Sequence, residues 1–116
     1  MKRMLFVIGA SMLMLVSAVA QEPAGEAGYA AAVYGYTCAG GTSIRVAYVN
    51  IDDGPALAVL SHDGKLLVME NVVSASGARY ATTGGRERYV WWADGPEGFL
   101  QKGPDGEEEF VEKACQ

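Results

Sequence analysis

Hydrophobic and polar positions alternate in short runs along most of this chain. In residues 43–50, Ile44, Val46 and Tyr48 alternate with residues that face the other way, which is the period-two pattern of a β-strand. Similar runs, rich in Val, Tyr, Thr and Gly, recur about every ten residues and are separated by Gly, Asp, Asn or Pro, and no helix signal stands out after residue 28. The pattern predicts eight strands, over residues 31–38, 43–50, 56–61, 65–72, 78–82, 87–93, 98–102 and 108–114.

Tight turns join most of the predicted strands. The Asp-Gly pair at residues 63–64 lies between two apolar runs and is a strong hairpin signal. The Gly-Gly pair at 84–85 and the Pro-Asp-Gly at 104–106 mark further turns. Strands joined in this way predict an all-β, eight-stranded antiparallel β-barrel over residues 31–116, because closure removes exposed strand edges. A β-sandwich is the alternative.

The first twenty residues differ from the rest. Two basic residues precede an apolar run at residues 4–16, and a cleavage pattern of the A-x-A type ends at Ala20. This layout predicts a secretory signal peptide over residues 1–20, since the apolar run is shorter than the ~20 residues of a membrane span. Residues 21–28 are small, polar or acidic, and we expect a flexible leader over residues 21–30. We therefore expect an exported, periplasmic protein without a membrane anchor in its mature form; a retained anchor helix is the alternative.

Charge narrows the range of partners. The chain has 9 Lys and Arg and 14 Asp and Glu, which gives a formal net charge of −5. Two of the basic residues and none of the acidic ones lie in residues 1–20, so residues 21–116 carry −7. Such a protein is not expected to bind nucleic acid, because it has no surplus of positive charge to neutralise phosphates. It suits a cationic partner, with salt-dependent association, although acidity also serves plain solubility.

Cys38 and Cys115 are the only cysteines. An exported chain oxidises such a pair, so we predict a disulfide that ties the first strand to the end of the last and supports closure. In the chain-entropy model, closing so long a loop stabilises the fold by roughly 4 kcal/mol. His62 is the only histidine and no C-x-x-C motif is present, so the sequence predicts neither a metal site nor a cofactor.

The sequence contains no recognisable catalytic constellation. A serine nucleophile needs a base, and His62 lies in a predicted turn. The G-x-S-x-G elbow and the glycine-rich phosphate motifs are missing from the sequence. The acidic run at residues 107–109 is most simply a solvated edge. We therefore expect a binding protein and not an enzyme.

Two segments are candidate contact sites. Residues 74–80 combine small residues, which let a partner approach the backbone, with serine hydroxyls that can donate to a carboxylate; an ordinary connection between strands is the alternative. In residues 90–100, Trp91 and Trp92 must point to opposite faces of a strand, so one of them lies outside or at a rim. Such a Trp can anchor an interface, or it can pack beneath residues 25–30. Because the two segments flank one hairpin, we expect them at the same end of the barrel.

These segments are also where the chain resembles a known family, the bacterial inhibitors of C-type lysozyme (MliC/PliC). The resemblance covers residues 34–116, and its matching residues are Tyr36-Thr37-Cys38, the Ser-Ala-Ser-Gly-Ala-Arg-Tyr stretch at 74–80, the Trp-Trp-x-x-Gly-Pro-Glu-Gly-Phe-Leu stretch at 91–100, and Cys115. It implies an eight-stranded barrel closed by one disulfide. It also implies that the loop around Ser76 enters the lysozyme cleft, where the serine hydrogen-bonds to the catalytic carboxylates. The residues then expected to contact lysozyme are Ser76, Gly77, Ala78, Arg79, Tyr80, Trp92, Asp94 and Gly95.

One position departs from the family pattern. Members commonly carry a lysine before the glycine that is here Gly95, and this chain has Asp94 instead. A lysine can pair with a carboxylate in the cleft, whereas an aspartate is repelled by it. Other positive residues that could serve this end are Arg79, Arg86, Arg88 and Lys102. The departure motivates a second hypothesis, an envelope ligand-binding or structural β-barrel that has lost lysozyme inhibition.

Overall fold

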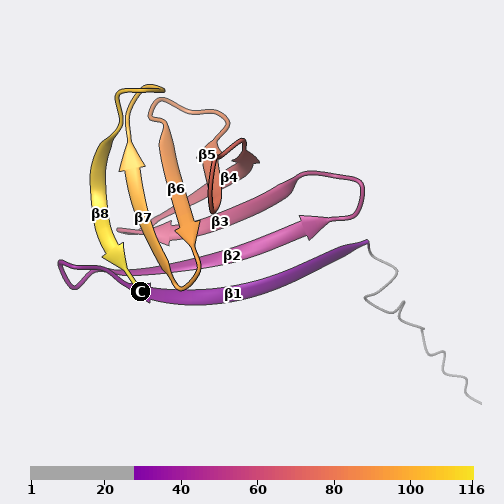
Figure 1. The fold of residues 1–116 in the computed structure, drawn as a ribbon, viewed down its shortest axis with the longest axis horizontal. Helices are drawn as coiled ribbons and strands as arrows, with labels where there is room; N and C mark the ends of the chain where they lie inside the picture. The colour runs from indigo at the N-terminus through magenta and orange to yellow at the C-terminus, as the bar shows by residue number, and fades with distance from the viewer. Residues whose placement is uncertain (1–27) are drawn as a thin grey trace, which may run out of the picture.

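The computed structural model describes residues 28–116, which form one eight-stranded β-sheet (Figure 1). Every neighbouring pair of strands is antiparallel, and the order of strands in the sheet is their order in the sequence. The predicted all-β, eight-stranded antiparallel fold is confirmed, and its strands form one sheet instead of the two of a sandwich. The strands are β1 (Tyr29–Thr37), β2 (Ser43–Ile51), β3 (Ala56–His62), β4 (Lys65–Val72), β5 (Ala78–Thr82), β6 (Tyr89–Asp94), β7 (Glu97–Lys102) and β8 (Glu109–Cys115).

Some strand ends differ from the expected ones. β1 begins at Tyr29, so residues 29–30, which we expected to end the leader, belong to the first strand. β6 begins at Tyr89 and not at residue 87, and the Tyr89 N–H donates to the Thr82 hydroxyl (3.0 Å) at this point. None of the described residues belongs to a helix long and apolar enough to cross a membrane. The predicted signal peptide and most of the predicted leader lie outside the described residues.

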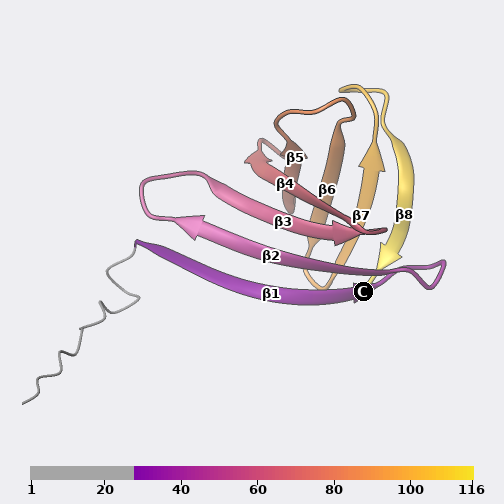
Figure 2. The same cartoon turned by 180° about the vertical axis from the view of Figure 1, so that it is seen from behind.

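The sheet curls, and its two edge strands meet at one corner (Figures 1 and 2). Thr37, at the end of β1, and Gln116, after β8, exchange two backbone hydrogen bonds of 2.8 and 3.0 Å. The predicted disulfide between Cys38 and Cys115 joins the same corner. Beyond this corner, no ladder joins β1 to β8 in residues 28–116, so the expected barrel is a curled sheet whose β1 edge stays open.

Large apolar side chains fill the concave face of the sheet. Trp91 of β6 is fully buried and lies between Tyr80 of β5 and Leu100 of β7 in the ladder. A Cβ atom at Gly98 would collide with the Trp91 ring, so only a glycine fits there. The other large side chains of this core without solvent exposure are Ile44, Val46, Leu60, Met69 and Leu100. These side chains belong to one buried cluster, which fixes the strands that carry the connections at their ends.

Candidate functional site

Two connections lie side by side at one end of the strands, the segment 73–77 between β4 and β5 and the turn 95–96 between β6 and β7. Ala78 and Ala93, which flank them, are directly opposed in the β5–β6 ladder. A Cβ atom at Gly77 would lie 2.7 Å from the Ala93 carbonyl oxygen, so the approach of the two connections requires glycine. The prediction that both segments lie at the same end is confirmed.

The connection that carries Ser76 is exposed. The Ser74 hydroxyl donates a 2.6 Å hydrogen bond to the Ser76 carbonyl oxygen, which closes a short local turn. Gly77 follows with φ of +67°, a left-handed conformation that other residues adopt only under strain. No hydrogen bond within residues 28–116 uses the Ser76 hydroxyl. This connection, which we call the first tip (residues 74–77), therefore presents an available hydroxyl on a backbone that neighbouring residues hold in one conformation.

The β6–β7 turn, which we call the second tip (residues 94–97), is acidic. Asp94 and Glu97 oppose each other at the base of the turn, and both are exposed. Gly95 has φ of +60°, which suits a tight turn. Among the ion pairs of residues 28–116, none involves either carboxylate. The turn thus adds negative charge at the position where the family resemblance leads one to expect a lysine.

A cavity of about 680 Å³ opens beneath the two tips, on the concave side of the sheet. The Trp91 indole N–H donates to the Tyr48 hydroxyl at 2.8 Å, and the Tyr48 hydroxyl lies 2.8 Å from that of Tyr36. Burial, together with the bond to Tyr36, raises the pKa of Tyr48 well above its ordinary value, and burial also raises the pKa of Tyr80. The cavity is uncharged and is lined by Tyr34, Gly35, Tyr36, Tyr48, Gly77, Ala78, Tyr80, Ala93, Gly95 and Pro96.

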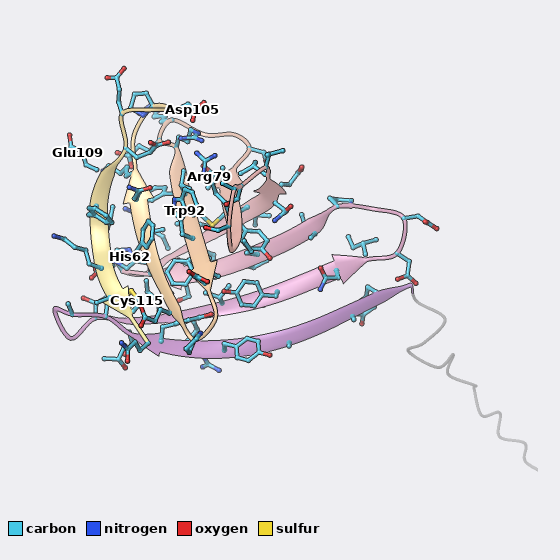
Figure 3. All side chains as sticks on the ribbon, viewed as in Figure 1. His62, Arg79, Trp92, Asp105, Glu109 and Cys115 are labelled. Atoms are coloured by element: carbon cyan, nitrogen blue, oxygen red, sulfur yellow. A yellow bond between two sulfur atoms is a disulfide. The ribbon has the colours of Figure 1, made fainter. Side chains whose placement is uncertain are left out.

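The other expected contact residues lie on β5 and β6, and their side chains point to opposite faces of the sheet. Tyr80 points into the concave face and is buried. Arg79 and Trp92 oppose each other in the β5–β6 ladder and lie on the outer face (Figure 3). The Arg79 guanidinium carbon lies 5.2 Å from the centre of the Trp92 ring, a cation–π arrangement. Trp91 is buried and Trp92 half-buried, which confirms that the two face opposite ways.

Two arginines and two carboxylates form a cluster on this outer face. Arg79 lies 3.4 Å from both Asp105 Oδ1 and Glu108 Oε2. Arg88 donates to the same Glu108 oxygen at 2.8 Å, and this hydrogen bond lowers the pKa of Glu108 below its ordinary value. Only 13% of the Glu108 side chain is exposed, so the expectation of a solvated edge at residues 107–109 is wrong for Glu108. Sequence spacing gave no sign of this cluster, because its members come from three separate connections and strands.

Trp92 also begins a row of aromatic rings. Its ring stacks on Phe99, with centroids 5.6 Å apart and planes 21° apart, and Phe99 meets Phe110 edge to face at 5.3 Å. The Trp92 indole N–H donates to the Gln101 side-chain oxygen at 3.0 Å. These contacts hold Trp92 against the outer face of the sheet. The alternative was that it packs beneath residues 25–30, of which residues 25–27 lie outside the described residues.

The positive residues considered as substitutes for a lysine lie elsewhere. Both arginines of the outer cluster are paired with carboxylates. Lys102 pairs with Glu87 at 3.1 Å, which raises the pKa of Lys102. Arg86 lies in the turn between β5 and β6, at the end of these strands opposite to Asp94. None of these four cations forms an ion pair with Asp94 in the described part of the chain.

His62 joins strands that are far apart in the sequence. It ends β3, and its Nε2 lies 2.8 Å from Oε2 of Glu112 on β8. Both side chains are largely buried, 11% and 15% exposed, and they connect the two halves of the curled sheet. Within residues 28–116, no group of three or more His, Cys, Asp or Glu side chains is placed to hold a metal ion.

Comparison with known proteins identifies relatives. A family described as "Membrane-bound lysozyme-inhibitor of c-type lysozyme" matches residues 36–109. Proteins named membrane-bound lysozyme inhibitor of C-type lysozyme are 50% identical over 66 residues in Cupriavidus necator and 37% identical over 81 residues in Pseudomonas aeruginosa. These alignments cover 57% and 70% of this chain, but only 49% and 61% of the relatives.

A solved structure has the same fold. It is the crystal structure of Pseudomonas aeruginosa MliC in complex with hen egg white lysozyme, which is 30% identical to this chain with a TM-score of 0.53. The match covers 87% of this chain and 100% of that one. From the family match, which spans most of the folded part, and from this shared fold, the chain belongs to the family of membrane-bound inhibitors of C-type lysozyme.

Proposed function

We propose that this protein inhibits C-type lysozyme by binding it, and that it catalyses no reaction itself. The observation that carries the proposal is the exposed Ser76-Gly77 tip, in a chain whose relatives are named as inhibitors of this enzyme. The net charge of −7 over residues 21–116 favours association with a cationic enzyme.

In the proposed mechanism, the tip enters the active-site cleft of lysozyme. The enzyme needs a protonated carboxylic acid and a nearby carboxylate at the bond that it cleaves. The Ser76 hydroxyl can accept a hydrogen bond from the first and donate one to the second, so it fills the space of the sugar without reacting. Gly77 and Ala78 add little bulk beside it. The hydrogen bond from Ser74 and the contact of Gly77 with Ala93 hold this backbone ready, which reduces the entropy lost on binding.

The other predicted contact residues take two roles in this proposal. Asp94 and Gly95 form the second tip and lie against the rim of the cleft. Arg79, Tyr80 and Trp92 support the tips from behind, since their side chains are already engaged within the sheet. The carboxylate of Asp94 opposes close approach to the enzyme's own carboxylates, so inhibition is weaker than with a lysine at this position.

We further propose that the protein is exported to the periplasm, with residues 1–20 removed as a signal peptide and residues 21–28 left as a leader. Mass spectrometry of the protein purified from a periplasmic extract tests this. A chain beginning at Gln21 is expected, and a chain that retains residues 1–20 in the membrane fraction would contradict it.

A lysis assay tests the inhibition. Purified exported protein is added to a C-type lysozyme acting on bacterial cell walls, at low and at moderate salt. Inhibition is expected at both, and weaker at higher salt because the charge attraction is screened. Ser76→Ala should weaken inhibition at least tenfold, whereas Ser61→Ala, at an exposed serine on β3, should not change it. Absence of inhibition at micromolar protein would overturn the proposed function, and an unchanged Ser76→Ala variant would overturn the mechanism.

The tyrosine-lined cavity favours one other candidate, an envelope protein that binds a small uncharged ligand. Its volume of about 680 Å³ lies in the range of ligand pockets, and its wall carries phenol hydroxyls and aromatic rings but no charge. Native mass spectrometry of the exported protein tests this candidate. A bound small molecule that Tyr48→Phe releases supports it, and a protein that purifies and stays free of ligand contradicts it.

A further inference from the structure

The open edge of β1 has an unusual composition. Its nine residues, Tyr29–Thr37, contain no charge and no proline. All are exposed except Tyr36, and the exposed apolar ones include Tyr29, Val33 and Tyr34, at 52%, 60% and 54%. The other edge strand, β8, carries Glu109, Glu112 and Lys113 within seven residues. Charges on an edge strand discourage pairing with other chains, so β8 is protected in a way that β1 is not.

Hydrogen bonds at the two ends of β1 show on which side of the strand each residue directs its backbone N–H and C=O groups. Thr37 directs both its N–H and its C=O away from β2, toward Gln116, whereas the Gly28 carbonyl accepts from Asp52 on the β2 side. Since directions alternate along a strand, the residues between them that point outward are Tyr29, Ala31, Val33 and Gly35. Within residues 28–116, no backbone bond uses the N–H or C=O groups of these four residues on that side. Four residues with two groups each leave eight unpaired groups in a row.

We propose that two copies of this chain pair edge to edge through β1, antiparallel and about a two-fold axis at Ala32. In this register Tyr29 lies opposite Gly35 of the second copy, and Ala31 lies opposite Val33 of the second copy. All eight outward groups then form hydrogen bonds across the interface. A register with its axis at Val33 satisfies only six, because Tyr29 then meets Thr37, whose groups are taken by Gln116. A register with its axis at Ala31 pairs only six of them within the described residues 28–116. The two curled sheets become one continuous sheet of sixteen strands, an isologous contact.

Side-chain sizes in this register favour a second copy as the occupant of the edge. Tyr29 lies over Gly35 of the second copy, where a large residue would collide with its ring. Val33 faces Ala31 on the same side of the sheet, and Tyr34 faces Ala30 on the other side. Each large side chain thus meets a small one, which is the complementarity that cross-strand packing needs. The lack of charge on β1 also matters, because charged side chains on this strand would lie close to the same charges of the second copy and repel them.

Sedimentation equilibrium of the exported protein, without lysozyme, tests the dimer. Twice the mass of the chain is expected. Val33→Pro should give a monomer, because it removes an outward N–H and leaves the β1–β2 ladder intact. Val33→Lys should do the same without a backbone change. Val68→Lys is the matched control on β4, where the valine is 55% exposed, and it should remain a dimer. A wild-type monomer at the highest soluble concentration overturns the proposal, as do Val33 variants that dimerise as well as wild type.

Cysteine cross-linking tests the register. The two copies of Ala32 face each other across the axis as a non-hydrogen-bonded pair, about 4.5 Å apart between Cα atoms, a separation that a disulfide spans. Ala32→Cys should therefore form a cross-linked dimer under mild oxidation, with the Cys38–Cys115 bridge intact by peptide mapping. Ala30→Cys is the control on the same strand and face, because its two copies lie about 13 Å apart. Equal cross-linking of both variants, or none by Ala32→Cys, overturns the proposed pairing. Because lysozyme is absent from both experiments, their outcome is independent of the proposed inhibition.

Discussion

Arg79 and Trp92 face each other across the β5–β6 ladder, with the guanidinium carbon 5.2 Å from the centre of the indole ring. The same guanidinium reaches Glu108, just before β8, so one side chain ties β5 to β6 and to the far end of the sheet. Only Gly77 and Ala78 separate Arg79 from the exposed Ser76. Contacts on the outer face therefore set the position from which the candidate tip projects.

Removal of the Arg79 side chain should destabilise the fold. Arg79→Ala loses the stacking on Trp92 and the contacts with Glu108, and we expect the free energy of unfolding to fall by about 1–2 kcal/mol. Urea denaturation followed by circular dichroism measures this. Arg45→Ala, at an exposed arginine of β2, is the control and should change stability by less than about 0.5 kcal/mol. Equal effects of the two variants would show that the outer cluster adds nothing.

Gly77 should be intolerant of a side chain. Gly77→Ala places a Cβ atom against the Ala93 carbonyl oxygen at positive φ, so the Ser76 connection must shift or the sheet must strain. We expect a loss of about 1–3 kcal/mol in stability and weaker inhibition of lysozyme in the lysis assay. Gly84→Ala is the control, because a Cβ there has no heavy atom within 4 Å. A Gly77→Ala protein with wild-type stability and activity would contradict the proposed role of this close contact.

Reversal of the charge at the second tip should strengthen inhibition. Asp94 and Glu97 are opposed and exposed, so a lysine at position 94 can pair with Glu97 and approach a carboxylate in the lysozyme cleft. We expect Asp94→Lys to lower the inhibitor concentration for half-maximal inhibition several-fold at low salt. Glu70→Lys makes the same change of net charge at an exposed site on β4. If both variants improve inhibition equally, overall charge and not the tip is responsible.

The buried tyrosines should make the fold sensitive to alkali. Burial raises the pKa of Tyr48 above its ordinary value of 10.0, so the folded state holds the neutral phenol more tightly than the unfolded state does. The resulting stability is present below pH 10 and is lost as the pH rises above that value toward the folded pKa. Unfolding free energies measured between about pH 8 and pH 11 should therefore decline at the alkaline end. Tyr48→Phe should flatten the decline, and the exposed Tyr29→Phe should not.

The alternation of side chains predicted most of the fold from sequence. It gave the eight strands and their order, because each strand pairs with its neighbour in the chain and local turns fix the pairing. The opposite faces of Trp91 and Trp92 and the shared end of the Ser76 and Asp94 connections followed from the same geometry. These relationships depend only on strand periodicity and on hairpins, both of which are local properties.

Apart from the disulfide, contacts between side chains of distant segments could not be predicted from the sequence. The pairing of His62 with Glu112 and of Arg79 with Glu108 depends on how the sheet curls, which no local pattern determines. The expectation of a closed barrel illustrates the same limit. The disulfide draws the edges together at Cys38, but the twist of the long β1 and β2 strands carries the β1 edge away from β8 (Figure 1).

The two adjacent tryptophans give this protein a pair of built-in spectroscopic reporters. Trp91 is fully buried and hydrogen-bonded to Tyr48, so its fluorescence reports on solvent entry into the interior. Trp92 stacks between Arg79 and Phe99 on the outer wall, so its emission reports on that surface instead. Replacing each tryptophan singly by phenylalanine separates the two signals. If the two variants give different melting curves, the outer face and the interior lose their structure at different temperatures.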